Sequence, residues 1–333
     1  MRLSRASIIV IVIGALLVIM APVWKWAIGP QFVRLPTDLD TSFSYDGTLK
    51  VYANPQTMTL LPAGQEQVTK LRITGTEKAV PSKSSSGIVV FHEKVVIKDA
   101  ATGQVLALGW EKTYALDRKT SQNVAGHSSD IARENLTVTF PIGTEKRSYL
   151  LWDDDTRNSG EAKFVKEQTL DGVDHKGVKV YVYQLSVGPD EMRNPPAGGL
   201  PSSMSGSQVK KILNNPNLPI PDDMKIPIAY FKKTSDTIVV EPRTGVKVGG
   251  KVHMEYSVNT AISGPLSYKT IAVIDYGQTS RSVQTAIDGS AKYFGLMDLD
   301  TTWMPLFSLI IGLILVVVGL FIGRRPKQVK LEG

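Results

Sequence analysis

The sequence of 333 residues contains no cysteine, and this absence excludes a disulfide-bonded scaffold, a cysteine-ligated zinc site and a thiol nucleophile. Its four histidines do not pair at the short spacings typical of metal ligands, so no metal site is expected. The sequence also lacks a G-x-S-x-G nucleophile elbow and a phosphate-binding P-loop. We therefore expect no metal and no cofactor, and we predict that the protein is not an enzyme.

Charged residues are missing from two long runs, one near each end of the chain. Residues 8–20 and 304–322 carry no charge, and each run with its apolar flanks is about long enough to cross a hydrocarbon core of ~30 Å. A cleaved signal peptide is the alternative for the first run, but no small-residue cleavage motif follows it. The sequence thus predicts transmembrane helices over residues 7–28 and 304–322.

The two short tails of the chain, residues 1–6 and 323–333, are basic. Because positive residues are retained on the cytoplasmic side, we expect both tails in the cytoplasm and residues 30–302 in the periplasm of a bacterial plasma membrane. The formal charge of +7 is then mainly a feature of topology, and no nucleic-acid partner is expected. The basic residues that set this orientation are Arg2, Arg5, Arg324, Arg325, Lys327 and Lys330.

Short runs of alternating apolar and polar residues, separated by Gly, Asp or Asn, fill the segment between the two apolar runs. This pattern predicts an antiparallel sheet or open barrel, so the fold class is mainly β with a few helices, held between two transmembrane helices. We expect a hairpin turn at Asp46-Gly47 and helices over residues 205–214 and 278–294. The predicted strands cover residues 88–98, 105–116, 136–140, 148–152, 164–170, 178–187, 229–232, 237–241 and 246–258.

Residues 189–227 differ from their surroundings because they contain 8 of the 19 prolines. Two interpretations stay open for this irregular insert: a lid over a cavity, or a solvated connection between parts of the sheet. If it is a lid, its apolar residues should bind the ligand. These candidate ligand-binding residues are Met192, Leu200, Met204, Val209, Ile212 and Leu213.

Two further motifs bear on function. Three consecutive aspartates, residues 153–155, are candidate acids, but their spacing does not match a calcium loop and we interpret them as a solvated turn. Gly319 and Gly323 form a GxxxG motif, which favours close helix packing in lipid. The partner would be the first span, through Gly14, or a second copy of the chain.

A distinctive set of residues lies within residues 130–153 and 240–245. It includes Arg133, Phe140, Pro141, Glu145, Lys146, Tyr149, Trp152, Asp153, Glu241, Pro242 and Gly245. With an anchor at each end, the chain resembles a family of actinobacterial two-span membrane proteins of unknown function, sometimes labelled the porin PorA family. The resemblance covers essentially the whole chain and implies a periplasmic domain concerned with envelope assembly: lipoglycan maturation, mycolate-glycolipid handling and polar growth. The motifs look structural, and none is a catalytic signature.

The layout, a β-rich domain between two terminal helices, is also loosely similar to that of the class B scavenger receptors, whose ectodomain contains a lipid tunnel. The leading hypothesis is a cell-envelope protein whose periplasmic domain binds or transfers an envelope lipid or glycolipid, mycolate- or lipoglycan-related. One alternative is a non-catalytic scaffold that docks to an envelope synthase or transporter. The other is an enzyme acting on a lipid-linked glycan with the acids at residues 153–155.

Overall fold

The computed structural model describes residues 4–54, 60–170, 177–193, 201–213, 215–260 and 269–323. The chain divides into two compact units. Residues 1–34 and 291–333 form the first unit, which contains the apolar helices, and residues 35–290 form the second, which contains the sheet.

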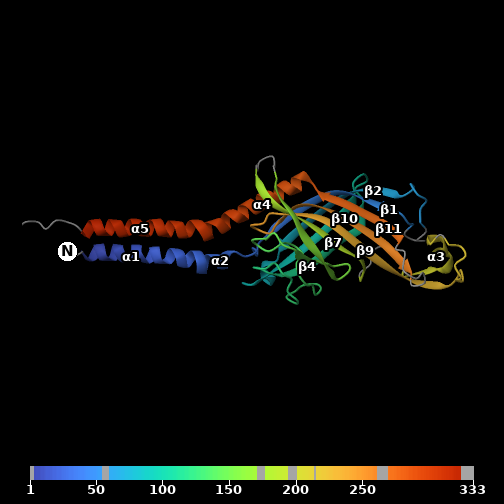
Figure 1. Cartoon of the computed structure of the whole chain (residues 1–333), viewed down its shortest axis with the longest axis horizontal. Helices are drawn as coiled ribbons and strands as arrows, with labels where there is room; N and C mark the ends of the chain where they lie inside the picture. Colours follow the sequence, from blue (N-terminus) through green and yellow to red (C-terminus); the bar gives the residue numbers. More distant parts are fainter. Residues whose placement is uncertain are drawn as a thin grey trace, which may run out of the picture. The chain divides into compact units, whose positions relative to one another are not determined.

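Two helices of the chain are long and apolar enough to cross a membrane. The first comprises α1 (Arg5–Val23), a π-helical turn η1 (Trp24–Ile28) and α2 (Gly29–Phe32). The second runs from α4 (Ser280–Asp298) through a π-helical turn η3 (Leu299–Trp303) into α5 (Met304–Gly323). Figure 1 shows α1 and α5 side by side.

Small residues bring α1 and α5 into close contact. A Cβ on Gly14 would lie 2.6 Å from the carbonyl oxygen of Gly312, and a Cβ on Gly312 would lie 2.7 Å from that of Gly14. The Ser308 hydroxyl donates to the Leu17 carbonyl at 3.0 Å, and the Ser7 hydroxyl donates to that of Gly319. Gly319 of the GxxxG motif therefore faces α1, as expected where small residues let helix backbones approach.

The second unit is one large antiparallel sheet. Its strand order is β4-β3-β2-β1-β11-β10-β9-β7-β6-β5, and the short β8 pairs with β9 off this path. Neighbours follow the chain in sequence apart from β1 beside β11 and β7 beside β9, so the order is that of a ring left open between β4 and β5. The strands are β1 (Asp40–Val51), β2 (Gln67–Ala79), β3 (Ile88–Asp99), β4 (Val105–Asp117), β5 (Tyr149–Asp153), β6 (Asn158–Leu170), β7 (Val178–Glu191), β8 (Ser203–Ser205), β9 (Lys225–Val240), β10 (Lys247–Thr260) and β11 (Lys269–Gln278).

The sheet curls, because side chains from distant strands share one cluster: Leu106 of β4 packs in the same group as Met254 of β10. The long connection from β4 to β5 crosses the opening between them. Isolated bridges pair Leu116 with Asn123 and Leu136 with Leu151, which lies on β5. We call the face that carries these apolar clusters the inner face, and the opposite face the outer face.

Two helices pack on the sheet. The first half of α4 covers part of the outer face, where Ile287 packs against Val180 and Val248. The short α3 (Gly206–Ile212) lies at one end of the sheet (Figure 1) and begins with a capping box. The Ser205 hydroxyl accepts the Gln208 backbone N–H, and the Gln208 side chain accepts that of Ser205, so both free N–H groups are satisfied.

The predicted hairpin at Asp46-Gly47 is wrong. β1 runs straight through both residues and pairs with β2 on one side and β11 on the other. Gly47 stands opposite Tyr276, and a Cβ at Gly47 would lie 2.6 Å from the Tyr276 Cβ. The glycine therefore makes room for a neighbouring strand's side chain and forms no turn.

Other predicted boundaries also need correction. The strand predicted at residues 136–140 is absent, because only Leu136 makes β-bridges there. The strands predicted at residues 229–232 and 237–241 are one continuous strand, β9. Strands β2, β8 and β11 were not predicted. Both predicted helices and the remaining predicted strands are confirmed, with shifted ends.

Candidate functional site

Two apolar groups occupy different parts of the inner face. The first, which we call the aromatic core, centres on Phe140, Tyr149 and Tyr183, and all three side chains are buried. Their ring centroids are 5.2 Å apart for Phe140–Tyr149, 4.9 Å for Phe140–Tyr183 and 5.9 Å for Tyr149–Tyr183. These separations lie in the favourable range for aromatic pairs, so this part of the inner face is filled by the chain itself.

The second group, which we call the apolar lining, is only partly covered. It surrounds a buried row that includes Leu71, Ile73 and Ile274. Strand alternation points its side chains to the inner face, yet they stay partly accessible, so described residues leave this part of the face incompletely filled. The apolar lining comprises Phe43, Tyr45, Leu49, Leu106, Leu108, Trp110, Met254, Tyr256 and Tyr276.

A polar row on β9 separates the two apolar groups. Lys232, Thr234 and Asp236 alternate onto the inner face, and the buried Lys232 ammonium lies 2.7 Å from a carboxylate oxygen of both Asp153 and Asp155. Among the described residues, the buried Thr234 Oγ1 and Asp236 Oδ1 have no hydrogen-bond partner. Burial raises the pKa of Asp236 to about 7, although the nearby Lys232 favours its charged form.

Further ionisable groups enclose the apolar lining from the other side. Glu77 of β2 stands directly opposite Glu93 of β3. Burial, reinforced by Glu93, raises the pKa of Glu77 to about 8, while burial lowers the pKa of Lys247. Glu93 accepts hydrogen bonds from the Trp110 indole at 3.0 Å and the Tyr114 hydroxyl at 2.6 Å. The inner face thus combines accessible aromatic rings with buried charge.

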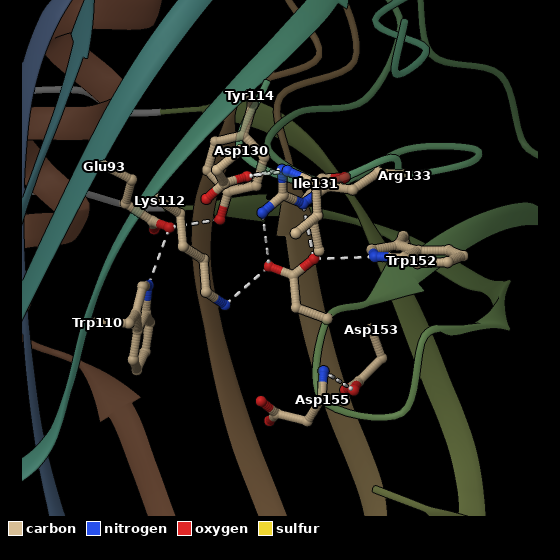
Figure 2. Close-up of polar contacts among 12 residues, drawn as sticks. Glu93, Trp110, Lys112, Tyr114, Asp130, Ile131, Arg133, Trp152, Asp153 and Asp155 are labelled. Atoms are coloured by element: carbon tan, nitrogen blue, oxygen red, sulfur yellow. Dashed lines mark hydrogen bonds and ion pairs between the residues drawn. The ribbon is translucent and has the colours of Figure 1, made fainter. Parts of the chain in front are cut away.

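An ion-pair network joins the two edges of the sheet (Figure 2). The Arg133 side chain is 1% exposed, and its Nε lies 2.7 Å from Asp154 Oδ1 while its Nη1 lies 2.6 Å from Asp130 Oδ1. Lys112 of β4 reaches Asp154 Oδ2 at 2.8 Å, and the Arg133 guanidinium also donates to the Thr113 carbonyl at 3.0 Å. Burial opposes ionisation of Asp154, but hydrogen bonds from Arg133 and the charge of Lys112 outweigh it and lower its pKa.

The interpretation of residues 153–155 as a solvated turn is corrected by this geometry. Their side chains are 12%, 10% and 36% exposed, and all three form ion pairs with Lys232, Arg133 or Lys112. Asp153 also accepts the backbone N–H groups of Asp155 and Thr156 at 3.0 Å, which fixes the turn. This role depends on a buried Arg or Lys far away in the sequence. The local pattern of residues 153–155 therefore could not have identified it.

The two motif stretches of the sequence meet in space. Gly245, with φ +76°, ends the β9–β10 turn, and a Cβ there would lie 2.2 Å from the Phe140 carbonyl oxygen. The Phe140 N–H donates to the Gly245 carbonyl at 3.0 Å, and the Thr144 N–H donates to that of Pro242 at 2.7 Å. The buried Glu241 carboxylate accepts the Thr244 N–H at 2.9 Å. Both stretches therefore fasten the aromatic core to this turn.

The remaining motif residues lie around the same core. The Glu145 backbone bonds to two core tyrosines. Its N–H donates to the Tyr149 hydroxyl at 2.8 Å, and its carbonyl accepts a hydrogen bond from the Tyr183 hydroxyl at 2.6 Å. Lys146 forms an exposed ion pair with Glu167 at 2.8 Å. The Pro141 carbonyl accepts a hydrogen bond from the Thr144 hydroxyl. Trp152 lies on the opposite face of β5 from Tyr149, and its indole donates to Asp154 at 2.9 Å.

The candidate lid residues pack in an apolar cluster that adjoins the apolar lining, since Tyr256 packs against both groups. Within the described residues this cluster also includes Ile226 of β9, Val258 of β10 and Ile271 of β11. Leu200 lies outside the described residues. The lid candidates in this cluster are Met192, Met204, Val209, Ile212 and, partly buried, Leu213.

Of the residues chosen for topology, Arg5 is the first residue of α1. The others, Arg2 and the C-terminal group Arg324, Arg325, Lys327 and Lys330, lie outside the described residues.

A family model for porin PorA matches residues 6–321 of the chain. The chain belongs to the porin PorA family. It is a membrane protein with two candidate spans, which fits the two-span layout implied by the sequence resemblance. No curated protein matches this chain. A solved structure from Alicyclobacillus acidocaldarius, a conserved protein of unknown function with a hot dog fold, is 11% identical over 73% of this chain and 81% of its own, with a TM-score of 0.12.

Proposed function

We propose that this PorA-family chain binds the apolar chain of an envelope amphiphile, a lipid or glycolipid, on the apolar lining. The observation that carries the proposal is the incomplete cover of nine apolar or aromatic side chains on the inner face of a curled sheet. Apolar groups that the chain itself leaves accessible are a favourable surface for an apolar ligand. The same chain carries two candidate membrane spans, and amphiphiles of this kind occur in membranes.

Polar groups beside the lining fit the other end of an amphiphile. The unsatisfied Thr234 Oγ1 and Asp236 Oδ1 lie on the same inner face, and buried polar groups normally have a partner. A ligand that carries hydroxyl or other donor groups next to an apolar chain would satisfy both requirements. The proposal thus assigns the tail to the lining and the head to the β9 row.

A pair of adjacent substitutions on β4 tests this function. Leu108 belongs to the lining, whereas Ala107 is exposed on the outer face, so Leu108→Asp and Ala107→Asp place the same charge on opposite faces. Full-length protein purified in detergent is extracted with organic solvent, and bound lipid is quantified by mass spectrometry.

We expect Leu108→Asp to retain several-fold less lipid than wild type, and Ala107→Asp to match wild type. Lipid held by the spans is common to all three proteins and cancels. Equal lipid content in both variants, with thermal unfolding unchanged, would reject binding on the lining and favour the scaffold alternative.

For topology we propose a bacterial plasma-membrane location with both termini in the cytoplasm and residues 30–302 in the periplasm, as the basic tails predict. Reporter fusions at each terminus should both report the cytoplasm. A periplasmic signal from either end would contradict this orientation.

A further inference from the structure

A pocket of 780 Å³ lies where β1, β2, β9, β10 and β11 run side by side. Gly277 of β11 lines it, and a Cβ there would have Lys251 Cγ at 3.5 Å as its nearest contact. Since Gly277 has no side chain, the row of outer-face residues is interrupted at this point. The polar residues that line the pocket are Asp46, Thr48, Lys70, Arg72, Ser235, Thr237, Lys251, His253 and Asp275.

Each acid of this pocket has one basic partner, and His253 neutralises Asp275 only when its imidazole is protonated. Asp46 Oδ1 lies 2.7 Å from Arg72 Nε, and Asp275 Oδ1 lies 2.7 Å from His253 Nδ1. By contrast, neither Lys70 nor Lys251 takes part in an ion pair within the part of the chain that the structure describes. Three cationic side chains, Lys70, Arg72 and Lys251, face two acids, Asp46 and Asp275, so the pocket keeps a net positive charge.

Hydroxyl donors complete the pocket. Thr48 and Asp275 are register partners, as are Ser235 and His253, so the two hydroxyls stand at either end of the His253–Asp275 pair. Neither Thr48 nor Ser235 has a side-chain hydrogen bond among the described residues. Two ammonium groups and two hydroxyls from four different strands thus line the pocket without a partner among the described residues.

Ser235, His253 and Asp275 share one cross-strand row, which raises the question of a nucleophilic site. A nucleophile and its base need a mutual hydrogen bond. In the described residues His253 bonds to Asp275 and no hydrogen bond joins it to Ser235. The row is therefore assigned to binding.

We propose that this outer-face pocket binds a phosphate group carried by a larger molecule. Lysine ammonium groups and hydroxyls are suitable donors to phosphate oxygens, and positive groups in a concave site raise the local concentration of an anion. The volume of 780 Å³ is in the range of sites for small molecules, so the phosphate would be one part of the ligand. The polar residues of this pocket lie on the outer face, whereas Leu71 and Tyr276, which also line it, belong to the apolar group of the inner face.

The test uses the full chain in phosphatidylcholine nanodiscs and measures binding of inorganic phosphate by calorimetry. We expect saturable binding, weakened by about tenfold or more in the double variant Lys70→Gln/Lys251→Gln. The matched control is Lys83→Gln/Lys166→Gln, which removes the same charge from exposed lysines outside the pocket and should leave affinity unchanged. Gly277→Val keeps every charge but fills the pocket, and it should also weaken binding.

Two results would overturn the proposal: no saturable binding by wild type up to ~10 mM phosphate, or equal weakening in the control pair. If the lysine variant does not fold, Gly277→Val decides, and unchanged affinity in that variant overturns the proposal. Competition with dihexanoylphosphatidylglycerol below its micelle concentration identifies the source. Displacement at concentrations well below those of phosphate indicates a lipid headgroup, and displacement only at equal or higher concentrations indicates a free or sugar-borne phosphate.

Discussion

The aromatic core and the apolar lining share one inner face and the same strand alternation, but their packing differs. In the aromatic core, Phe140 and Tyr183 are fully buried, and a loop supplies Phe140 to close over the strands. In the apolar lining, Tyr45 and Tyr276 stay partly accessible. One part of the face is therefore closed by the chain itself, whereas the other keeps apolar side chains partly accessible.

The largest effect on stability is expected in the aromatic core. Phe140→Ala should lower the free energy of unfolding by about 3–5 kcal/mol, because it removes a buried ring and leaves a cavity. Phe43→Ala, the matched truncation in the lining, should cost clearly less because its ring is only partly buried. Thermal unfolding of the full chain in nanodiscs measures both variants. Equal losses of stability would contradict the difference in packing between the aromatic core and the apolar lining.

The next largest effect concerns the network that joins the edges. Arg133→Met should destabilise the protein by about 3 kcal/mol, because it leaves the buried Asp154 with Lys112 as its one remaining cationic partner among the described residues. Arg147→Met is the control, since its ion pair with Glu145 is exposed and should contribute at most about 1 kcal/mol. Similar unfolding temperatures for the two variants would show that the network does not hold the edges together.

A smaller, pH-dependent effect is expected from Glu77. Its pKa is raised from the usual 4.5 to about 8, so the folded state binds the proton more tightly and stability falls as pH rises through this interval. Glu77→Gln removes this loss of stability with rising pH, because a glutamine side chain does not titrate. The variant should match wild type near pH 4.5, become more stable than wild type as pH rises, and keep a constant advantage above about pH 8. An advantage that does not change with pH would contradict the buried, protonated carboxyl.

Sequence reasoning recovered what depends on local pattern. Alternation gave most strands, the Ser205 cap and apolar spacing gave α3, and uncharged length gave the spans. It failed where the role of a residue depends on a partner that lies far away in the sequence. Gly47 looks like a turn residue, but its role is set by Tyr276 on a strand more than two hundred residues away.

In the candidate site, too, features that depend on contacts between distant residues were missed. Motif residues such as Phe140 and Gly245, which the sequence predicts to be structural, lie in the aromatic core and its turn. The ion pairs of Asp153 and Asp154 were missed, because their partners lie on β9 and in the β4–β5 connection. The apolar lining could not be recognised either, since it depends on how the sheet curls.

The central claim, that the apolar lining is a ligand surface and the aromatic core is not, is tested most directly by photo-crosslinking. A fatty acid that carries a diazirine is added to the full chain in phosphatidylcholine nanodiscs, irradiated, and the labelled positions are mapped by peptide mass spectrometry. Labels on α1 and α5 serve as the internal control for the membrane. We predict additional labels at Leu106, Leu108 or Met254 and none at Phe140 or Tyr183. Labels confined to the two spans, or equally frequent in the aromatic core, would contradict the account.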